Sequence, residues 1–189
     1  HGDQEAVAML ALFRATLRDI CSRRAVRIAK WLGDGAMLVA VEPTPLLAAV
    51  LELQHCAAAL PRPMGIRCGA TQGPVILLEG DDYIGHEVNL AARLCDAAGE
   101  REILATPAVA RHLPAWAEAG EPEEHPIRGL DLPVTVVRLS VRDGGPGAIC
   151  DPVCGIPLSA HAALADDPSH DGQRFCSDSC LDTWLGRAS

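Results

Sequence analysis

Lysine is almost missing from this chain of 189 residues, because Lys30 is the only one among 16 lysines and arginines. The chain also lacks a basic run, a low-complexity tract and an internal repeat, and its net charge is −9. A protein that binds a DNA or RNA backbone needs clustered lysines and arginines. We therefore expect no nucleic acid as the main partner, and a lone lysine raises the question of what it does that arginine cannot.

A long apolar run is missing as well. The most apolar stretch, 46–60, is interrupted by Glu52, Gln54 and His55, so we predict no membrane-spanning segment in this chain. The first residue is His1 rather than methionine, which indicates that the natural N-terminus lies upstream. The lack of a signal or anchor in this chain therefore excludes little.

The eight cysteines fall into two groups. Four are scattered through apolar patterns and are expected to be small buried hydrophobes: Cys21, Cys56, Cys68 and Cys95. The other four are paired near the C-terminus: Cys150, Cys154, Cys176 and Cys180. Since no secretory feature is visible, the paired cysteines favour a metal over disulfides, and a cytoplasmic location.

Hydrophobic periodicity predicts an α+β protein with helices on one side of a mainly antiparallel sheet. The predicted helices cover 3–20, 43–59, 85–98 and 107–113. The predicted strands cover 25–32 paired with 36–41, 64–71 paired with 75–78, then 102–105, 125–128 and 134–139. We predict a first domain over 1–141, a linker over 142–148, and a module over 149–189 that is too small to build a core unaided.

The sequence Gly33-Asp34-Gly35 forms a tight turn between two predicted strands. A carboxylate on such a turn stands clear of the sheet and could hold a hard cation such as Mg²⁺. The alternative is an ordinary hairpin turn, because aspartate and glycine both tolerate positive φ.

Asn89 and Arg93 are four residues apart, so on a helix they share one face. An amide and a guanidinium on one face suit a ribose and a polyphosphate. The alternative is a solvated helix face with an ordinary asparagine and arginine.

Three segments in order, KWLGDGAMLVA, GIRCGATQGPV and DDYIGHEVNLAARLCDAAGEREILAT, resemble the class III adenylate/guanylate cyclase catalytic domain. The resemblance runs over about residues 3–139, and NLAAR is its most specific part. It implies a ferredoxin-like domain that works as a homodimer, with each active site at the interface and built from both chains.

The resemblance also implies roles for single residues. Asp34 matches one of two aspartates that hold two divalent cations, Mg²⁺ or Mn²⁺. Lys30 and Asp82 match the residues that read adenine, and guanine would want the reverse pattern of donors and acceptors. The only lysine of the chain thus falls at the adenine-reading position.

On the third predicted helix, Asn89 matches the residue that orients the ribose, and Arg93 the residue that stabilises the transition state. Arg128 is the rough match for a basic residue that touches phosphate. The family's other metal-binding aspartate lies on a first strand, upstream of where this sequence begins. We expect either a trimmed chain, which the start at His1 favours, or a cyclase relic, and no catalytic competence for these 189 residues alone.

The C-terminal segment contains CDPVCGIPLSA and GQRFCSDSCLDTW. Cys176 and Cys180 are one helical turn apart, and Cys150 precedes Cys154 by four residues. Four convergent thiolates would make a closed tetrahedral site for Zn²⁺ or another soft metal, which would supply much of the folding free energy. The alternatives are two disulfides or free buried thiols.

The DPVCG and FCSDSC motifs closely resemble the YHS family of small metal-associated domains, related to the TRASH type. The resemblance covers about residues 149–185 and implies Cys154, Cys176 and Cys180 as ligands. Cys150 is an extra cysteine, and His161 or His170 could compete for the fourth place.

The leading hypothesis is therefore a lyase of signal transduction, an adenylate cyclase that converts ATP into cyclic AMP and pyrophosphate by two-metal phosphoryl transfer. The C-terminal module would bind metal and could regulate the enzyme. The rival hypothesis is an inactive cyclase-homology domain that acts as a nucleotide-binding or metal-sensing module. An upstream strand bearing the other aspartate would discriminate them. Guanylate specificity is disfavoured by Lys30 and Asp82.

Overall fold

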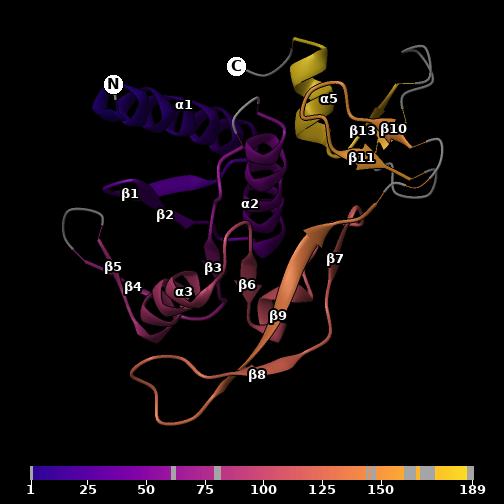
Figure 1. Ribbon diagram of the computed structural model, residues 1–189. Helices are drawn as coiled ribbons and strands as arrows, with labels where there is room; N and C mark the ends of the chain where they lie inside the picture. The colour runs from indigo at the N-terminus through magenta and orange to yellow at the C-terminus, as the bar shows by residue number, and fades with distance from the viewer. Residues whose placement is uncertain are drawn as a thin grey trace.

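The structure is a computed structural model that describes residues 2–60, 63–78, 82–143, 145, 148–159, 165–166 and 173–186. Its helices are α1 Gly2–Arg23, α2 Pro43–Ala58, α3 His86–Ala97, α4 Pro107–Ala110 and α5 Asp178–Trp184 (Figure 1). The strands of the first 141 residues are β1 Arg27–Leu32, β2 Gly35–Val39, β3 Cys68–Ala70, β4 Ile76–Leu77, β5 Tyr83–Ile84, β6 Ile103–Ala105, β7 Ala117–Ala119, β8 Glu123–His125 and β9 Val134–Val141. The strands beyond them are β10 Ile149–Cys150, β11 Pro157–Leu158, β12 Ala165–Asp166 and β13 Arg174–Phe175.

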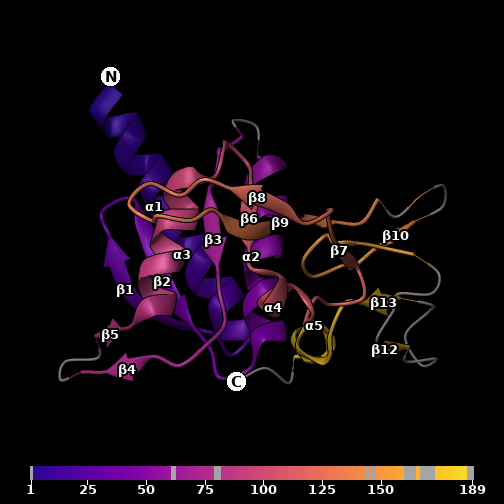
Figure 2. The ribbon, with the colours of Figure 1, turned by 90° about the horizontal axis from the view of Figure 1, so that it is seen from below.

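The long helix α1 and the hairpin that follows it were both predicted and are confirmed. The C-terminal half of α1 buries Leu17, Ile20 and Cys21, whereas most residues of its first three turns are exposed. Figure 2 shows these N-terminal turns projecting away from the rest of the chain. Strands β1 and β2 pair antiparallel with Leu32 opposite Gly35, which places Gly33 and Asp34 in the turn.

A five-stranded sheet forms the centre of the fold, in the order β3-β6-β9-β7, with β8 also paired to β9. The β3-β6 pair is parallel and the other pairs are antiparallel. The predicted pairing of 64–71 with 75–78 is wrong, since β4 pairs with β5 instead. An isolated two-stranded hairpin buries little surface, whereas β3 gains burial beside β6 and under α3.

The prediction that the helices cover one side of the sheet is also wrong. Along β6, Ile103 and Ala105 belong to the core cluster that contains α2 residues, while Leu104 belongs to the cluster of α3. Successive side chains of a strand point to opposite faces, so α2 and α3 cover different faces. In Figure 1, α2 lies above β6, and α3 lies to the left of it. The mixed α+β class with a mainly antiparallel sheet is confirmed.

The C-terminal segment shares its core with the sheet and α2. One buried cluster contains Leu51 of α2 and Val137 of β9 together with Ile156, Phe175 and Cys180. A segment of this size cannot bury enough apolar surface alone, and the shared cluster supplies the missing surface. The predicted boundary at 142–148 stays a prediction, and residues 144, 146 and 147 lie outside the described part.

Several sheet edges have no strand partner within the described residues, and one arm of the fold is exposed. The edge of β2 away from β1, and the edge of β3 away from β6, have no strand partner among the described residues. The β4–β5 arm exposes Ile76, Leu77 and Ile84 by 60%, 55% and 43%. No helix in the described ranges is long and apolar enough to cross a membrane.

Candidate functional site

The structure brings Lys30 and Asp82 together. Lys30 lies near the end of β1, and Asp82 immediately precedes β5. The Lys30 Nζ atom donates a hydrogen bond to Asp82 Oδ2 at 3.1 Å, and the two side chains are 51% and 45% exposed. Neighbouring Asp81 lies outside the described residues. The pair offers a donor and an acceptor, side by side, to a planar ligand.

Arg93 lies on α3 and reaches the loop that carries Arg128. Its Nη1 atom donates a hydrogen bond to the backbone carbonyl of Arg128, whose side chain is exposed. The next residue, Gly129, has φ +80°, and a Cβ atom there would meet Arg93 Nη1 at 2.4 Å. The positive φ therefore favours glycine at position 129, whereas the end of the flexible Arg93 side chain could shift to make room for a Cβ atom. The sequence analysis missed Gly129, and the PIRGL context was its only signal.

Asn89 is exposed on α3, one turn before Arg93. Helix α3 is held at its start, where Thr71 Oγ1 donates to the carbonyl of Glu87 at 3.0 Å. It also packs directly on β3, because a Cβ atom on Gly69 would lie 2.1 Å from the carbonyl oxygen of Ala91. The absence of a side chain at Gly69 thus sets the position of the helix that carries Asn89 and Arg93.

Asp34 is exposed in the turn between β1 and β2. Arg14 of α1 donates from Nη2 to the carbonyl of Gly33 at 2.9 Å, and its guanidinium lies 5.0 Å from the ring centroid of Trp31. Arg18 stacks on the same ring at 5.2 Å. Helix α1 therefore braces the turn from one side.

The divalent cations implied by the resemblance fit this turn only in part. Asp34 offers one carboxylate. Among the described residues, the group able to supply three or more ligands is the cysteine cluster, and Asp34 is not in it. The described part of one chain therefore does not hold the ligand set of a two-cation site.

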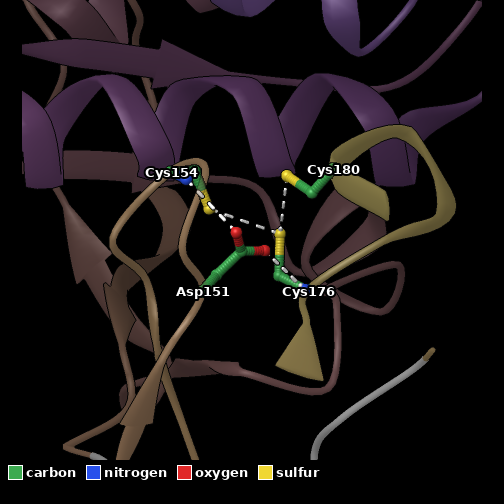
Figure 3. Close-up of side chains that lie close together, drawn as sticks. All are labelled: Asp151, Cys154, Cys176 and Cys180. Atoms are coloured by element: carbon green, nitrogen blue, oxygen red, sulfur yellow. Dashed lines mark hydrogen bonds between the residues drawn. The ribbon is translucent and has the colours of Figure 1, made fainter. Parts of the chain in front are cut away.

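A second constellation lies in the C-terminal segment (Figure 3). One ligand atom each of Asp151, Cys154, Cys176 and Cys180 lies within 4.8 Å of all the others, and all four residues are buried. The Sγ atom of Cys176 is 3.5 Å from that of Cys154 and 3.6 Å from that of Cys180. Tetrahedral Zn²⁺ with Zn–S bonds of about 2.3 Å requires sulfur atoms about 3.8 Å apart. The cluster therefore fits a tetrahedral soft metal.

Cys150, the fourth predicted thiolate, lies outside this cluster. It is exposed on β10, opposite Pro157. Asp151 lies just after β10 and is buried, whereas Cys150 is exposed. His161 and His170, the other candidates for the fourth place, lie outside the described residues. The sequence analysis did not name Asp151, although the DPVCG motif contains it.

Asp151 also organises the two cysteine loops. Its Oδ1 accepts hydrogen bonds from the backbone N–H groups of Val153 at 2.8 Å and Cys154 at 3.2 Å. Its Oδ2 accepts from the N–H of Cys176 at 2.7 Å. One carboxylate thus ties the first cysteine loop to the second, and each oxygen retains lone-pair capacity for a metal.

The thiol groups of the cluster differ in their pKa values. Hydrogen bonds from Cys154 and Cys180, together with Arg24, hold the pKa of Cys176 far below its ordinary value despite burial. The hydrogen bond to Cys176 raises the pKa of Cys154. Cys176 is therefore the thiol of the cluster that loses its proton most readily. All eight cysteines, all within the described ranges, are free, which contradicts the disulfide alternative.

The scattered cysteines differ from the cluster. Cys21 is buried, and burial raises its pKa to about 11. Burial likewise raises the pKa of Cys56 and Cys95. A protonated, shielded thiol is inert, so these residues act as small hydrophobes, although Cys56, Cys68 and Cys95 are only half-buried.

Two arginines at the end of α1 contact the cysteine cluster, and sequence reasoning missed them. Arg24 Nη2 lies 3.2 Å from Cys176 Sγ, and Arg24 Nε donates to Glu52 Oε2 at 2.5 Å. Arg23 donates to the other oxygen of Glu52 and lies 3.9 Å from Cys180 Sγ. Glu52 is fully buried in α2. The available signal was a charged residue inside the most apolar stretch of the chain.

The same contact region contains a cavity of about 240 Å³. Its walls include Arg23, Arg24, Trp116 and Cys176. Nearby, His55 of α2 lies with Nε2 3.1 Å from the carbonyl of Gly155, which adds a second link between α2 and the first cysteine loop. Cys176 is the residue of the cysteine cluster that lines this cavity.

The overall fold matches solved nucleotide cyclase domains. An adenylate/guanylate cyclase/hydrolase from Silicibacter pomeroyi has a TM-score of 0.64 at 19% identity, over 75% of this chain and 88% of that chain. The adenylyl cyclase CyaB from P. aeruginosa has a TM-score of 0.58 at 20% identity, over 74% of this chain and 84% of that chain. The chain therefore has the fold of class III adenylate/guanylate cyclase domains.

Sequence relatives point in the same direction. The chain is 36% identical over 132 residues to an uncharacterized protein of Mycobacterium tuberculosis, covering 69% of this chain and 34% of that protein. It is 31% identical over 130 residues to a pH-sensitive adenylate cyclase of M. tuberculosis, covering 65% of this chain and 32% of that protein. The chain thus spans about a third of the length of the curated relatives it matches. No protein-family model matches the chain.

Proposed function

We propose that this chain is the catalytic part of an adenylate cyclase that converts ATP into cyclic AMP and pyrophosphate. The observation that carries the proposal is the Lys30–Asp82 pair on a cyclase fold. The ammonium of Lys30 donates to the N1 atom of adenine, and the carboxylate of Asp82 accepts from the 6-amino group. The adenylate cyclase among the sequence relatives supports the same nucleotide.

The residues of α3 and the loop beyond it supply the rest of the nucleotide site. Asn89 orients the ribose, Arg93 donates to charge that develops on the α-phosphoryl oxygens, and Arg128 contacts the polyphosphate. The ribose 3′-oxygen bonds to the α-phosphorus, the bond from that phosphorus to the bridging oxygen breaks, and pyrophosphate leaves. The hydroxyl proton passes to solvent. Positioning and charge stabilisation provide most of the rate enhancement.

Asp34 provides one carboxylate for Mg²⁺ or Mn²⁺ in this proposal. Such a cation, when bound, neutralises the triphosphate and favours ionisation of the 3′-hydroxyl. The remaining ligands come from outside the described residues. The unpaired edges of β2 and β3 are where an additional strand, such as the aspartate-bearing strand that the resemblance implies, would pair.

We propose that the active form is a homodimer. The β4–β5 arm exposes four consecutive apolar residues, from Val75 to Leu78, and Ile84 opposite them. An exposed apolar patch of this kind marks an interaction surface. A second copy of the chain is the occupant that the cyclase resemblance implies.

The test is cyclic AMP formation from Mn²⁺-ATP by the natural full-length protein. Arg93→Ala should lower turnover by about 10²–10³-fold, because a donor to the transition state is lost. Arg111→Ala removes an exposed arginine of α4's end and is the matched control. ATP binding without any turnover in the folded wild type would favour the rival proposal, a nucleotide-binding cyclase relic.

The second part of the proposal is a metal site in the C-terminal segment, in which Cys154, Cys176, Cys180 and Asp151 hold Zn²⁺ or another soft metal. Four buried ligands are typical of a closed structural site, in which Asp151 would take the place that a fourth cysteine or a histidine has in most such sites. Co²⁺ titration should give thiolate-to-cobalt charge-transfer absorption in the wild type. Cys176→Ser should abolish this absorption, whereas Cys150→Ser should retain it, and equal loss in both variants would contradict the ligand set.

A further inference from the structure

The cysteine cluster is in direct contact with the end of the first helix of the cyclase fold. Arg24, the residue just after α1, has a side chain that is 4% exposed, and it contacts the sulfur of Cys176 and the carboxylate of Glu52 at the same time. Arg23 makes the parallel contacts with Glu52 and, more weakly, with Cys180. Two guanidinium groups from one part of the chain therefore lie against the sulfur atoms of the other.

Two guanidinium groups and two carboxylates lie beside the cysteine cluster. The buried Glu52 pairs with both Arg23 and Arg24, and the exposed Asp19 pairs with Arg23 at 3.1 Å. Arg24 therefore shares its carboxylate partner with Arg23, and its Nη2 atom faces the sulfur of Cys176. Four anionic ligands around a divalent ion leave a net negative complex. A buried charge is costly unless a partner balances it, so the buried Arg24 guanidinium beside Cys176 and the metal complex stabilise one another.

The arginines also lead directly into the strand that carries the nucleotide-site candidates. Ala25 follows Arg24 and has φ +53°, a left-handed conformation that a residue with a side chain rarely adopts. Val26 is buried, and β1 then runs to Lys30 and the Asp34 turn. A strained residue persists only where its neighbours hold it, so the anchoring of Arg24 bears on the start of β1.

We propose that Arg24 is a positioning residue of the metal site, contributed by the cyclase fold, and that it couples occupancy of the Cys154–Cys176–Cys180 site to the order of the β1–β2 hairpin. This inference rests on the metal-binding part of the proposed function and is independent of the cyclase part. Because coupling between two sites is reciprocal, a ligand that orders the hairpin also raises the affinity of the cysteine site for metal. Metal occupancy would thereby control how well ordered Lys30 and Asp34 are in the nucleotide site.

The first arm of the test measures Co²⁺ affinity by competition with a chelator, in the full chain. The double variant Arg24→Gln/Glu52→Gln replaces a buried ion pair with two neutral amides and removes the guanidinium beside Cys176, and it is compared with Glu52→Gln alone. The double variant should bind Co²⁺ about 10–100-fold more weakly than the single variant, since partners of ligand atoms have effects of this size. Arg24→Lys retains the charge without the paired donors and should lie between them. Arg111→Gln should match the wild type.

The second arm measures amide hydrogen exchange of residues 26–39 with and without Zn²⁺. In the wild type, Zn²⁺ should slow exchange in β1 and β2 by about fivefold or more. In the double variant saturated with Zn²⁺, this slowing should disappear. Far-UV circular dichroism establishes that each variant is folded.

Each outcome decides the inference. Equal Co²⁺ affinity of the double and single variants, or equal hairpin protection with and without Zn²⁺, would overturn it while the metal site stands. Absence of thiolate-to-cobalt absorption in the wild type would overturn the metal site and this inference together, and would leave the cyclase proposal intact. A natural full-length protein that binds metal but makes no cyclic AMP would overturn only the cyclase proposal.

Discussion

The Lys30 Nζ atom lies 3.1 Å from Asp82 Oδ2, although 52 positions separate the two residues in the sequence. Lys30 lies in strand β1 of the β1–β2 hairpin, and Asp82 is the residue just before β5. An ion pair between half-exposed side chains contributes little to stability. The ion pair therefore matters mainly because it presents a hydrogen-bond donor and an acceptor to a ligand.

This geometry predicts the base preference of the enzyme. Exchanging the two charges, Lys30→Glu with Asp82→Lys, retains the ion pair and reverses the donor and acceptor positions. Guanine offers the matching reversed pattern, so the exchange should shift the ratio of kcat/KM for ATP over GTP by about 10²-fold or more toward GTP. Each single substitution should lower cyclic AMP formation from ATP. An exchanged variant that is folded and still prefers ATP would contradict the assignment of both residues.

Gly69 predicts a packing defect at the helix that carries Asn89 and Arg93. A methyl group at this position would overlap the backbone of α3 at Ala91 and Cys95, and backbone yields less easily than a side-chain end. Gly69→Ala should lower the free energy of unfolding by about 1–3 kcal/mol, measured by urea denaturation. Gly120→Ala is the control, because its new methyl would meet only ordinary contacts at 3.7 Å and beyond. Equal stability of the two variants would argue against tight α3 packing.

The exposed arm predicts the oligomeric state. Ile76→Asp with Leu77→Asp places two charges on the apolar face of β4 and should convert a dimer into a monomer in sedimentation velocity. Val41→Asp is the matched control, since Val41 is 96% exposed but lies outside the arm. Dissociation by both sets of substitutions, or by neither, would show that the arm is not the interface.

Glu102 predicts a pH dependence of stability. Its pKa lies below the ordinary value of 4.5, because it accepts a hydrogen bond from the N–H of Gly99 and, despite partial burial, pairs with Arg138. A lowered folded-state pKa gives stability that is present above the unfolded pKa and is lost as the pH falls through the folded pKa. Glu102→Gln should therefore cost about 1 kcal/mol near pH 7, and this difference should vanish in acid.

Urea unfolding of Glu102→Gln and of the wild type, measured from pH 7 down to a pH below the folded-state pKa of Glu102, checks the prediction. Glu121→Gln, an exposed carboxylate on the loop before β8, provides the baseline. A difference between Glu102→Gln and the wild type that persists unchanged in acid would place its cause outside the ionisation of Glu102.

Local patterns in the sequence predicted most of the elements and missed how they assemble. The alternation after Ala25 and the Gly33-Asp34-Gly35 turn act within one hairpin, so β1 and β2 were predictable. The pairing of β3 with β6 joins residues 68–70 to 103–105, and no turn signal reports such a contact. The face that α3 covers depends on whether Leu104 or its neighbours point toward it, which single-strand periodicity cannot decide.

Some residues of the candidate site could also be predicted from local patterns, and others could not. Cys154, Cys176 and Cys180 were predictable because their spacing follows a loop and a helical turn, and the structure brings them together. The exchange of Cys150 for Asp151 depends on which of two neighbouring residues at the end of β10 is buried. The role of Arg24 was not predictable because its partner Cys176 lies 152 positions later in the sequence. The role of Glu52 depends on Arg23 and Arg24, which lie 29 and 28 positions earlier.

In the proposed homodimer, two copies of the chain together form the sites that convert ATP into cyclic AMP. The most direct test of this claim mixes two inactive full-length variants, Asp34→Ala and Arg93→Ala, refolds or co-expresses them, and measures cyclic AMP formation from Mn²⁺-ATP. If Asp34 and Arg93 act in one site from different protomers, half of the dimers are mixed and each holds one intact site, so the mixture should regain about a quarter of wild-type turnover. A mixture that forms dimers and stays as inactive as either variant alone would contradict the claim.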